Sequence, residues 1–139
     1  MAGYIKTIKQ DTDVIYPVTM AEAVIGLGAE GYSTEETVAG GTWVDGKTIY
    51  QKTINFGALP NATTKVVAHG ITGISHIIDM KAVAWTSSGT TIVLPYAHPQ
   101  SVQYQVSWYV DNTNINIITG DNKSGYSSCY VTIYYTKSS

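Results

Sequence analysis

The sequence predicts an all-β protein: an antiparallel β-sandwich or jelly-roll head that follows a short N-terminal arm with one small helix. From Thr42 onward, apolar and polar residues alternate as they do in strands with one buried face. Turn-forming stretches such as Asp45-Gly46 separate these runs at nearly regular spacing, and no long helical pattern interrupts them. Such a succession of short strands is typical of sandwiches and jelly rolls rather than of parallel α/β sheets.

The composition argues against several classes of function. The chain has 139 residues, of which 44% are hydrophobic, and this suits one compact domain with a short appendage. The formal net charge is −2, arginine is absent and the lysines are scattered, so we expect no nucleic-acid binding. The apolar runs are too short to span a bilayer, so we expect no membrane insertion. Met1 is expected to be the true start, without a signal peptide.

Residues 1–31 are predicted to be an arm with short extended pieces and one small helix. Thr19 and Glu22 have the spacing of a capping box, in which each side chain satisfies a free backbone amide of the first helical turn. Gly26 and Gly28 then end the helix after about two turns, a length that is not stable alone. The arm is therefore expected to lean on the head or on another copy of the chain.

Residues 32–42 contain paired glycines and paired glutamates, and they are predicted to be a linker. The head is predicted to cover residues 43–139, with a tight turn at Asp45-Gly46 near its start. Its predicted strands, in chain order, are 49–56, 65–71, 74–86, 90–99, 102–110, 115–119 and 126–137.

Cysteine and histidine offer little chemistry in this sequence. Cys129 is the only cysteine, so it forms no intrachain disulfide, and its place in an alternating run predicts a small buried side chain. A nucleophilic role for it requires a histidine that the sequence does not place. His69 is predicted to bond a neighbouring carbonyl, His76 to pack between subunits and His98 to be exposed. We therefore expect no metal, no cofactor and no enzymatic activity. A pair of catalytic carboxylates for glycoside cleavage stays open, because such residues need only be close in the folded structure and not in the sequence.

The aromatic composition suggests a binding surface. The chain has 11 tyrosines and 3 tryptophans but only 1 phenylalanine, and Tyr and Trp combine an apolar face with a polar tip. These residues equally suit the interior of strands, and both roles can hold. Sugar sites pair an aromatic face with Asp, Asn or Gln side chains. The candidate ligand-binding residues, each of which also suits an ordinary turn, are Trp85, Tyr96, His98, Asn112, Asp121, Asn122 and Tyr126.

Several motifs together resemble a module of bacteriophage structural proteins. They are "TWVDGKTIYQKTI" at 42–54, "GALPNATTK" at 57–65, "AHGI" at 68–71 and, near the end, Tyr130 with the terminal "YTK" at 135–137. This pattern resembles the distal domain of tail fibres, baseplate proteins and head fibres, and the resemblance covers residues 30–139. The stretch "DVIYPVTMAEAV" at 13–24 is similar to the N-terminal attachment segment of short phage fibre proteins.

The resemblance implies a homotrimeric fibre or decoration protein of a virion, assembled in the cytoplasm of the bacterial host. The arm is expected to dock on other virion proteins, whether capsid, neck or tail. The head is expected to face outward and to bind a host-surface carbohydrate. Two alternatives remain: a purely structural capsid or tail decoration protein without a host ligand, and a small hydrolase of cell-wall polysaccharide.

Overall fold

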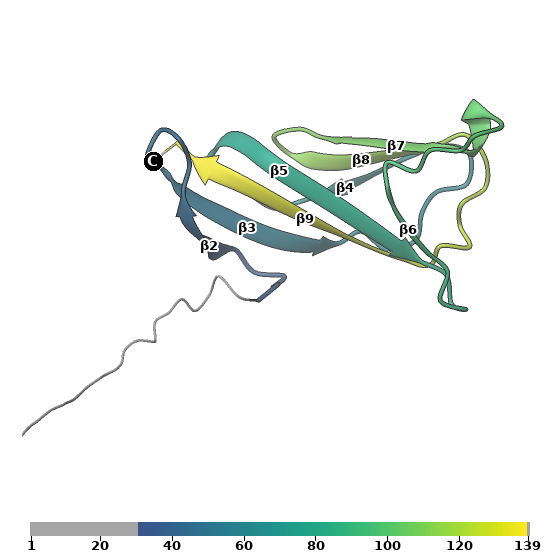
Figure 1. Cartoon of the computed structure of the whole chain (residues 1–139), viewed down its shortest axis with the longest axis horizontal. Coiled ribbons are helices and arrows are strands. Elements are labelled where there is room, and N and C mark those ends of the chain that lie inside the picture. The colour runs from purple at the N-terminus through teal and green to yellow at the C-terminus, as the bar shows by residue number, and fades with distance from the viewer. Residues whose placement is uncertain (1–30, 139) are drawn as a thin grey trace, which may run out of the picture.

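The computed structural model of the chain describes residues 31–138, so the predicted arm helix lies outside the described residues. These residues form two antiparallel sheets, which confirms the all-β class (Figure 1). One sheet has five strands in the order β2-β3-β9-β5-β6, and the other has three in the order β4-β8-β7. The elements are β2 (Thr37–Thr42), β3 (Thr48–Asn55), β4 (Thr64–Ala68), β5 (Ile74–Trp85), β6 (Thr91–Leu94), the 3-10 helix η3 (Val102–Tyr104), β7 (Val106–Val110), β8 (Asn114–Thr119) and β9 (Ser128–Lys137).

Both sheets contribute side chains to one core. β9 lies at the centre of the five-stranded sheet, between β3 and β5. Because alternate residues of a strand point to the same side, every second residue of β9 enters the core. Ile115 and Ile117 of β8 enter the same cluster from the three-stranded sheet. The core-facing residues of β9, all fully buried, are Cys129, Val131, Ile133 and Tyr135.

The five-stranded sheet begins earlier in the chain than the sequence predicts. Thr37–Thr42, which lie in the predicted linker 32–42, form β2 and pair with β3. The register shifts between Val38 and Thr42, where Gly40 and Gly41 have φ angles of 80° and 104°. These left-handed conformations favour glycine, so the two glycines build an irregularity in an edge strand instead of loosening a linker.

The predicted strand over 102–110 is shorter than expected. Val102–Tyr104 form the 3-10 helix η3, and only Val106–Val110 are strand. The backbone of η3 lies against Gly120, where an added Cβ would stand 2.5 Å from the carbonyl oxygen of Gln103. This close approach between distant segments is a tertiary feature that alternation along one segment does not encode.

Candidate functional site

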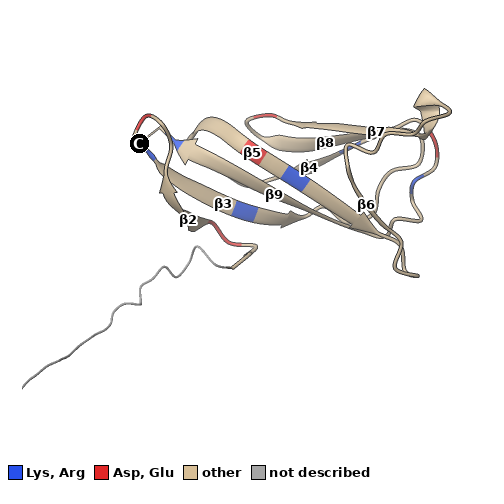
Figure 2. Ribbon diagram, in the orientation of Figure 1, with Lys and Arg blue, Asp and Glu red and all other residues tan. Residues whose placement is uncertain are grey.

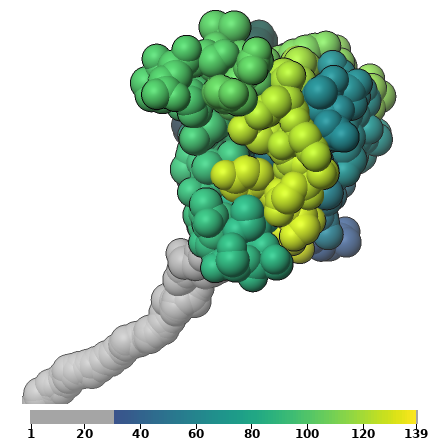
Figure 3. Space-filling model, turned by 90° about the vertical axis from the view of Figure 1, so that its right-hand side faces the viewer, coloured from purple at the N-terminus to yellow at the C-terminus, as the bar shows by residue number. Residues whose placement is uncertain are grey.

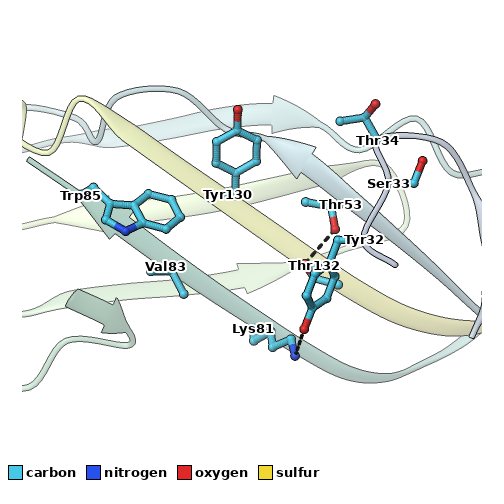
Figure 4. A pocket seen from close by; sticks show the side chains of 9 residues that line it. All are labelled: Tyr32, Ser33, Thr34, Thr53, Lys81, Val83, Trp85, Tyr130 and Thr132. Atoms are coloured by element: carbon cyan, nitrogen blue, oxygen red, sulfur yellow. Dashed lines mark hydrogen bonds between the residues drawn. The ribbon is translucent and has the colours of Figure 1, made fainter. Parts of the chain in front are cut away.

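The outer face of the five-stranded sheet, opposite the core, carries an open hollow of about 500 Å³. We call it the Trp85 groove (Figure 4). Its lining comes from β3, β5, β9 and the segment that precedes β2. The residues that line it are Tyr32, Ser33, Thr34, Thr53, Lys81, Val83, Trp85, Tyr130 and Thr132.

Strand alternation places the floor of the Trp85 groove. Tyr130 and Thr132 alternate along β9 with the core residues, so they face the other side of the sheet. Thr132 pairs with Thr53 of β3, and their hydroxyl oxygens are 2.9 Å apart. The ring of Trp85, at the end of β5, meets the ring of Tyr130 edge-on, with centroids 6.0 Å apart. The groove therefore has an aromatic end and a hydroxyl-bearing floor.

One wall of the groove is the segment that leads into β2. Among the described residues, three hydrogen bonds hold its first part, residues 31–33, to the sheet. Gln51 Nε2 donates to the Gly31 carbonyl at 2.7 Å, and the Thr53 amide donates to the Ser33 carbonyl at 2.9 Å. Lys81 Nζ donates to the Tyr32 hydroxyl at 2.8 Å (Figure 4). The groove is therefore completed by residues that lie outside the strands.

Among residues 31–138, Lys81 is the only charged residue that lines the Trp85 groove. Its Nζ lies 5.1 Å from the ring centroid of Tyr32 and 5.6 Å from that of Tyr134. The hydrogen bond to Tyr32 raises the pKa of Lys81, and the same contact lowers the pKa of Tyr32. Among residues 31–138, no carboxylate forms an ion pair with Lys81. Within that range Lys81 Nζ donates one hydrogen bond, to Tyr32, so its other N–H groups can serve a ligand as a polar anchor beside aromatic surfaces.

The lining favours binding over acid–base chemistry. None of the nine lining residues is a carboxylate or a histidine. What the groove offers is aromatic surface, four hydroxyl groups on Ser and Thr, and one ammonium group. Aromatic planes with a few convergent polar groups are the usual equipment of small-molecule and sugar sites.

Of the seven residues predicted to bind a ligand, only Trp85 lines this groove. Tyr96, His98 and Asp121 lie at one end of the molecule, together with Tyr104 and Lys123, and we call these five residues the loop-end cluster. Figure 3 faces this end, where the green segment near residue 100 lies beside the yellow-green segment that follows β8.

The other predicted residues serve turns or packing. Asn122 Oδ1 accepts hydrogen bonds from the Ser124 amide and hydroxyl, as an ordinary turn residue does. Tyr126 is half-buried and packs against the core. Asn112 is exposed in the turn between β7 and β8, whereas the loop-end cluster lies at the opposite end of those strands. The seven residues therefore do not form one site.

The contacts of the loop-end cluster are mutual. The His98 ring lies 4.9 Å from that of Tyr104 and 6.3 Å from that of Tyr96. Lys123 Nζ lies 5.5 Å from the Tyr96 ring and 5.9 Å from the Tyr104 ring, and 3.3 Å from Asp121 Oδ1. This Oδ1 is buried and has no hydrogen bond within residues 31–138, so the pair is a charge contact without hydrogen-bond geometry. The cluster joins two loops, and Lys123 contacts both rings and the Asp121 carboxylate within it.

The sequence-based prediction missed most of the groove because its candidate residues were taken from the turns between strands. Thr53, Val83, Tyr130 and Thr132 lie within strands. The available signal was the outward phase of the last strand, where tyrosine and threonine occupy positions that a purely solvated face would give to charged residues. Tyr32 was missed because it lies in the predicted linker 32–42.

The cysteine and one histidine match their predicted environments. Cys129 is fully buried, and this burial raises the pKa of its thiol to about 12. The ring of His69 is buried, with Nε2 2.9 Å from the Asp111 carbonyl and Nδ1 accepting from the Ile71 amide. His98 was predicted to be exposed but is half-buried against two tyrosines. His76 is exposed in the single chain, and its packing between subunits stays a prediction.

Within residues 31–138, no three histidine, cysteine or acidic side chains lie close enough to share a metal ion. That same range holds no helix with the length and apolar character needed to cross a bilayer. Comparison with known proteins found no matching family model, no matching curated protein and no matching solved structure.

Proposed function

We propose that the chain is a bacteriophage virion structural protein, a head or tail fibre or decoration protein, whose head binds host-surface carbohydrate in the Trp85 groove. The observation that carries the carbohydrate part is the edge-on pair of Trp85 and Tyr130 beside the hydroxyls of Thr53 and Thr132. The virion part rests on the motifs at 42–71 and 135–137, which resemble phage fibre domains.

The proposed binding mode follows from the chemistry of a sugar. A pyranose ring has an apolar C–H face that can lie on an aromatic plane and a rim of hydroxyls that require hydrogen-bond partners. In the groove, Trp85 and Tyr130 receive the C–H face. Lys81 donates to ring or hydroxyl oxygens, and the threonine hydroxyls accept and donate on the other side.

We further propose a homotrimer of β-sandwich heads, each joined to the virion by an N-terminal arm that contains the short helix. The outer face of the three-stranded sheet supports this assembly. Its outward residues, identified by their register with buried neighbours, include no charged side chain, and Val66 and Tyr109 are each 52% exposed there. Packing copies through this face leaves the Trp85 groove on the outside. Light scattering on Tyr109→Lys is expected to give monomers.

A cell-adhesion assay with the full chain tests the carbohydrate part. Fluorescent wild-type protein is expected to bind host cells, and extracted cell-wall polysaccharide is expected to compete. Trp85→Ala is expected to lose at least about tenfold in affinity, because stacking and the groove end are lost together. Val102→Ala is the matched control, since this residue is exposed but lines no part of the groove. If the wild-type protein does not bind host cells, the carbohydrate part of the proposal is overturned.

The alternative is a purely structural decoration protein with no host ligand. What favours it is that the exposed residues of both sheets include large apolar side chains, such as Val93 on the larger sheet and Val66 on the smaller one. Such surfaces also suit contacts with other virion proteins. Virions that carry Trp85→Ala would then assemble poorly, whereas carbohydrate binding predicts normal assembly with impaired adsorption.

A further inference from the structure

A second hollow shares the outer face of the five-stranded sheet with the Trp85 groove. It measures about 430 Å³, and Trp43, Ile49, Ile78 and Tyr134 supply its apolar surface. We call it the Trp43 hollow. Trp43 follows β2 and is 37% exposed, so part of its ring surface remains open. Nothing in the proposed sugar site uses these residues.

Strand register shows that the two hollows are neighbours along the sheet. In β9, Thr132 of the groove and Tyr134 of the hollow are two residues apart and therefore share a face. In β5, Lys81 pairs with Thr132 and Asp79 pairs with Tyr134, so these rows are adjacent. The span from Trp85 to Asp79 is six residues of strand, or about 20 Å.

The boundary between the hollows is polar. Asp79 and Lys81 stand there on neighbouring outward positions of β5, where Figure 2 shows a red and a blue band side by side. Asp79 Oδ1 accepts a hydrogen bond from the Met80 amide at 2.9 Å. The other carboxylate oxygen, Oδ2, can accept hydrogen bonds from a ligand. Lys81 Nζ lies over the Tyr134 ring, so one side chain touches both regions. Each aromatic hollow is thus separated from the other by one hydrogen-bond donor and one acceptor.

We infer that the Trp43 hollow is a second subsite and that the ligand is a linear polysaccharide bound along the sheet. One sugar unit stacks at Trp85, a later unit packs in the Trp43 hollow, and hydroxyls between them bond Lys81 and Asp79. A single terminal sugar would leave the second aromatic hollow and the Asp79 carboxylate without a role. This inference rests on the proposed carbohydrate function and adds the class of ligand, a chain rather than a chain end.

The test measures how affinity depends on ligand length. Host cell-wall polysaccharide is partially hydrolysed, fractionated by size and titrated calorimetrically into full-length protein. For the wild type, the longer fragments are expected to bind at least about three- to tenfold more tightly than the shortest binding fragment, the range expected for one further aromatic contact. Trp43→Ala is expected to abolish this gain and to leave the affinity for the shortest fragment unchanged. Trp85→Ala is expected to weaken binding of every fragment.

Two further variants keep the result interpretable. Val44→Ala, beside Trp43 and 89% exposed, is the matched control and is expected to behave as wild type. Trp43→Phe keeps a ring in the hollow, so it is expected to retain part of the gain even if Trp43→Ala proves unstable. Affinity that is independent of length, or a gain that survives Trp43→Ala, overturns the second subsite while the Trp85 groove stands. If no fragment binds wild-type protein, both the inference and the carbohydrate function are overturned.

Discussion

Two regions of the described structure place a lysine against two tyrosines, but the surroundings of the two lysines differ. In the Trp85 groove, Lys81 is exposed, touches Tyr32 and Tyr134, and has no carboxylate partner among the residues that the structure describes. In the loop-end cluster, the Lys123 side chain is only 13% exposed and is paired with Asp121. The same residue types therefore leave an exposed lysine beside a hollow in one region and a largely buried, ion-paired lysine between two loops in the other.

The difference lies in where the lysine is attached and what surrounds it. Lys81 projects from the outer face of a strand, where neighbouring rings border a hollow. Lys123 follows β8 in a loop, and its ammonium group lies over two rings of a facing loop. A buried ammonium group needs a counter-charge, whereas an exposed one does not. Lys123 thus stabilises the contact between two loops. The ammonium group of Lys81 is exposed, so a ligand can replace the water around it.

The largest expected effect breaks the closed region. Gly120→Ala places a Cβ 2.5 Å from the Gln103 carbonyl oxygen, and this contact is with backbone, so η3 or the end of β8 must shift. We expect a loss of about 2–3 kcal/mol in the free energy of unfolding, typical of an overpacked site. Urea denaturation measures it. Gly125→Ala is the matched control, because no atom lies within 4 Å of its added Cβ. Equal stability of the two variants would show that η3 does not pack on Gly120.

The next effect compares the two lysines directly. Lys123→Met removes the partner of Asp121 and the contacts with Tyr96 and Tyr104, so it should lower the free energy of unfolding by about 1–2 kcal/mol. Lys81→Met removes an exposed contact and should change stability by less than about 0.5 kcal/mol. Binding of host polysaccharide should respond in the opposite order. Two lysines with equal stability costs would mean that burial does not distinguish these regions.

A third lysine, Lys137, is paired with a carboxylate as Lys123 is, and it extends the comparison to pH. Lys137 Nζ lies 2.9 Å from a carboxylate oxygen of Glu36, in the segment between the groove wall and β2. Burial opposes ionisation of Glu36, but hydrogen bonds from Tyr135 and Lys137 outweigh it and lower the pKa of Glu36 below 4.5. A carboxylate with a lowered folded pKa stabilises the fold fully above its unfolded pKa and loses that contribution as pH falls through the folded value.

Glu36→Gln isolates this contribution. At pH 7 the variant should be about 1 kcal/mol less stable than wild type, since Tyr135 and Lys137 lose a charged acceptor. The difference between the two proteins should shrink as pH falls below about 4.5. Urea denaturation of both proteins from pH 7 to pH 3 measures the trend. A difference that stays constant, or grows in acid, would contradict the lowered pKa.

Alternation predicted the two longest strands well because it reports which side of a strand is buried, but the predicted strand over 90–99 is strand only at Thr91–Leu94. β5 and β9 followed from their pattern, and the buried Cys129 followed with them. Alternation failed where contacts between distant segments decide the structure. β2 exists because β3 offers it an edge, and η3 is accommodated because Gly120 is small. Neither partner is visible within the segment that changes.

The candidate site was harder to predict for a related reason. Turn residues such as Tyr96 and Asp121 look available in the sequence, but the fold brings their loops together, where they bind one another through Lys123. The outward residues of the strands look structural, but cross-strand pairing assembles Thr53 with Thr132 and Trp85 with Tyr130. Which residues remain free is a property of the completed fold, and the pattern of a single strand does not contain it.

The smallest expected effect tests the hydrogen bond between Lys81 and Tyr32 in the Trp85 groove. Tyr32→Phe keeps the ring beside Lys81 but removes the hydroxyl that accepts its hydrogen bond. Because that hydrogen bond is the main reason why the pKa of Lys81 is raised, the pKa should fall toward its usual value in the variant. Stability should change by less than about 0.5 kcal/mol, as for other exposed contacts.

NMR titration of the lysine side-chain methylene signals measures this pKa, with Lys81→Met to assign the signal. Tyr109→Phe is the matched control, because this exposed tyrosine belongs to β7 of the other sheet and lines no part of the groove. A Lys81 titration that is the same in wild type and Tyr32→Phe would mean that Tyr32 does not hold the lysine. The wall of the groove would then depend on the contacts at Gly31 and Ser33 and on the bonds of Glu36 with Tyr135 and Lys137, and Lys81 would reach a ligand from a less defined position.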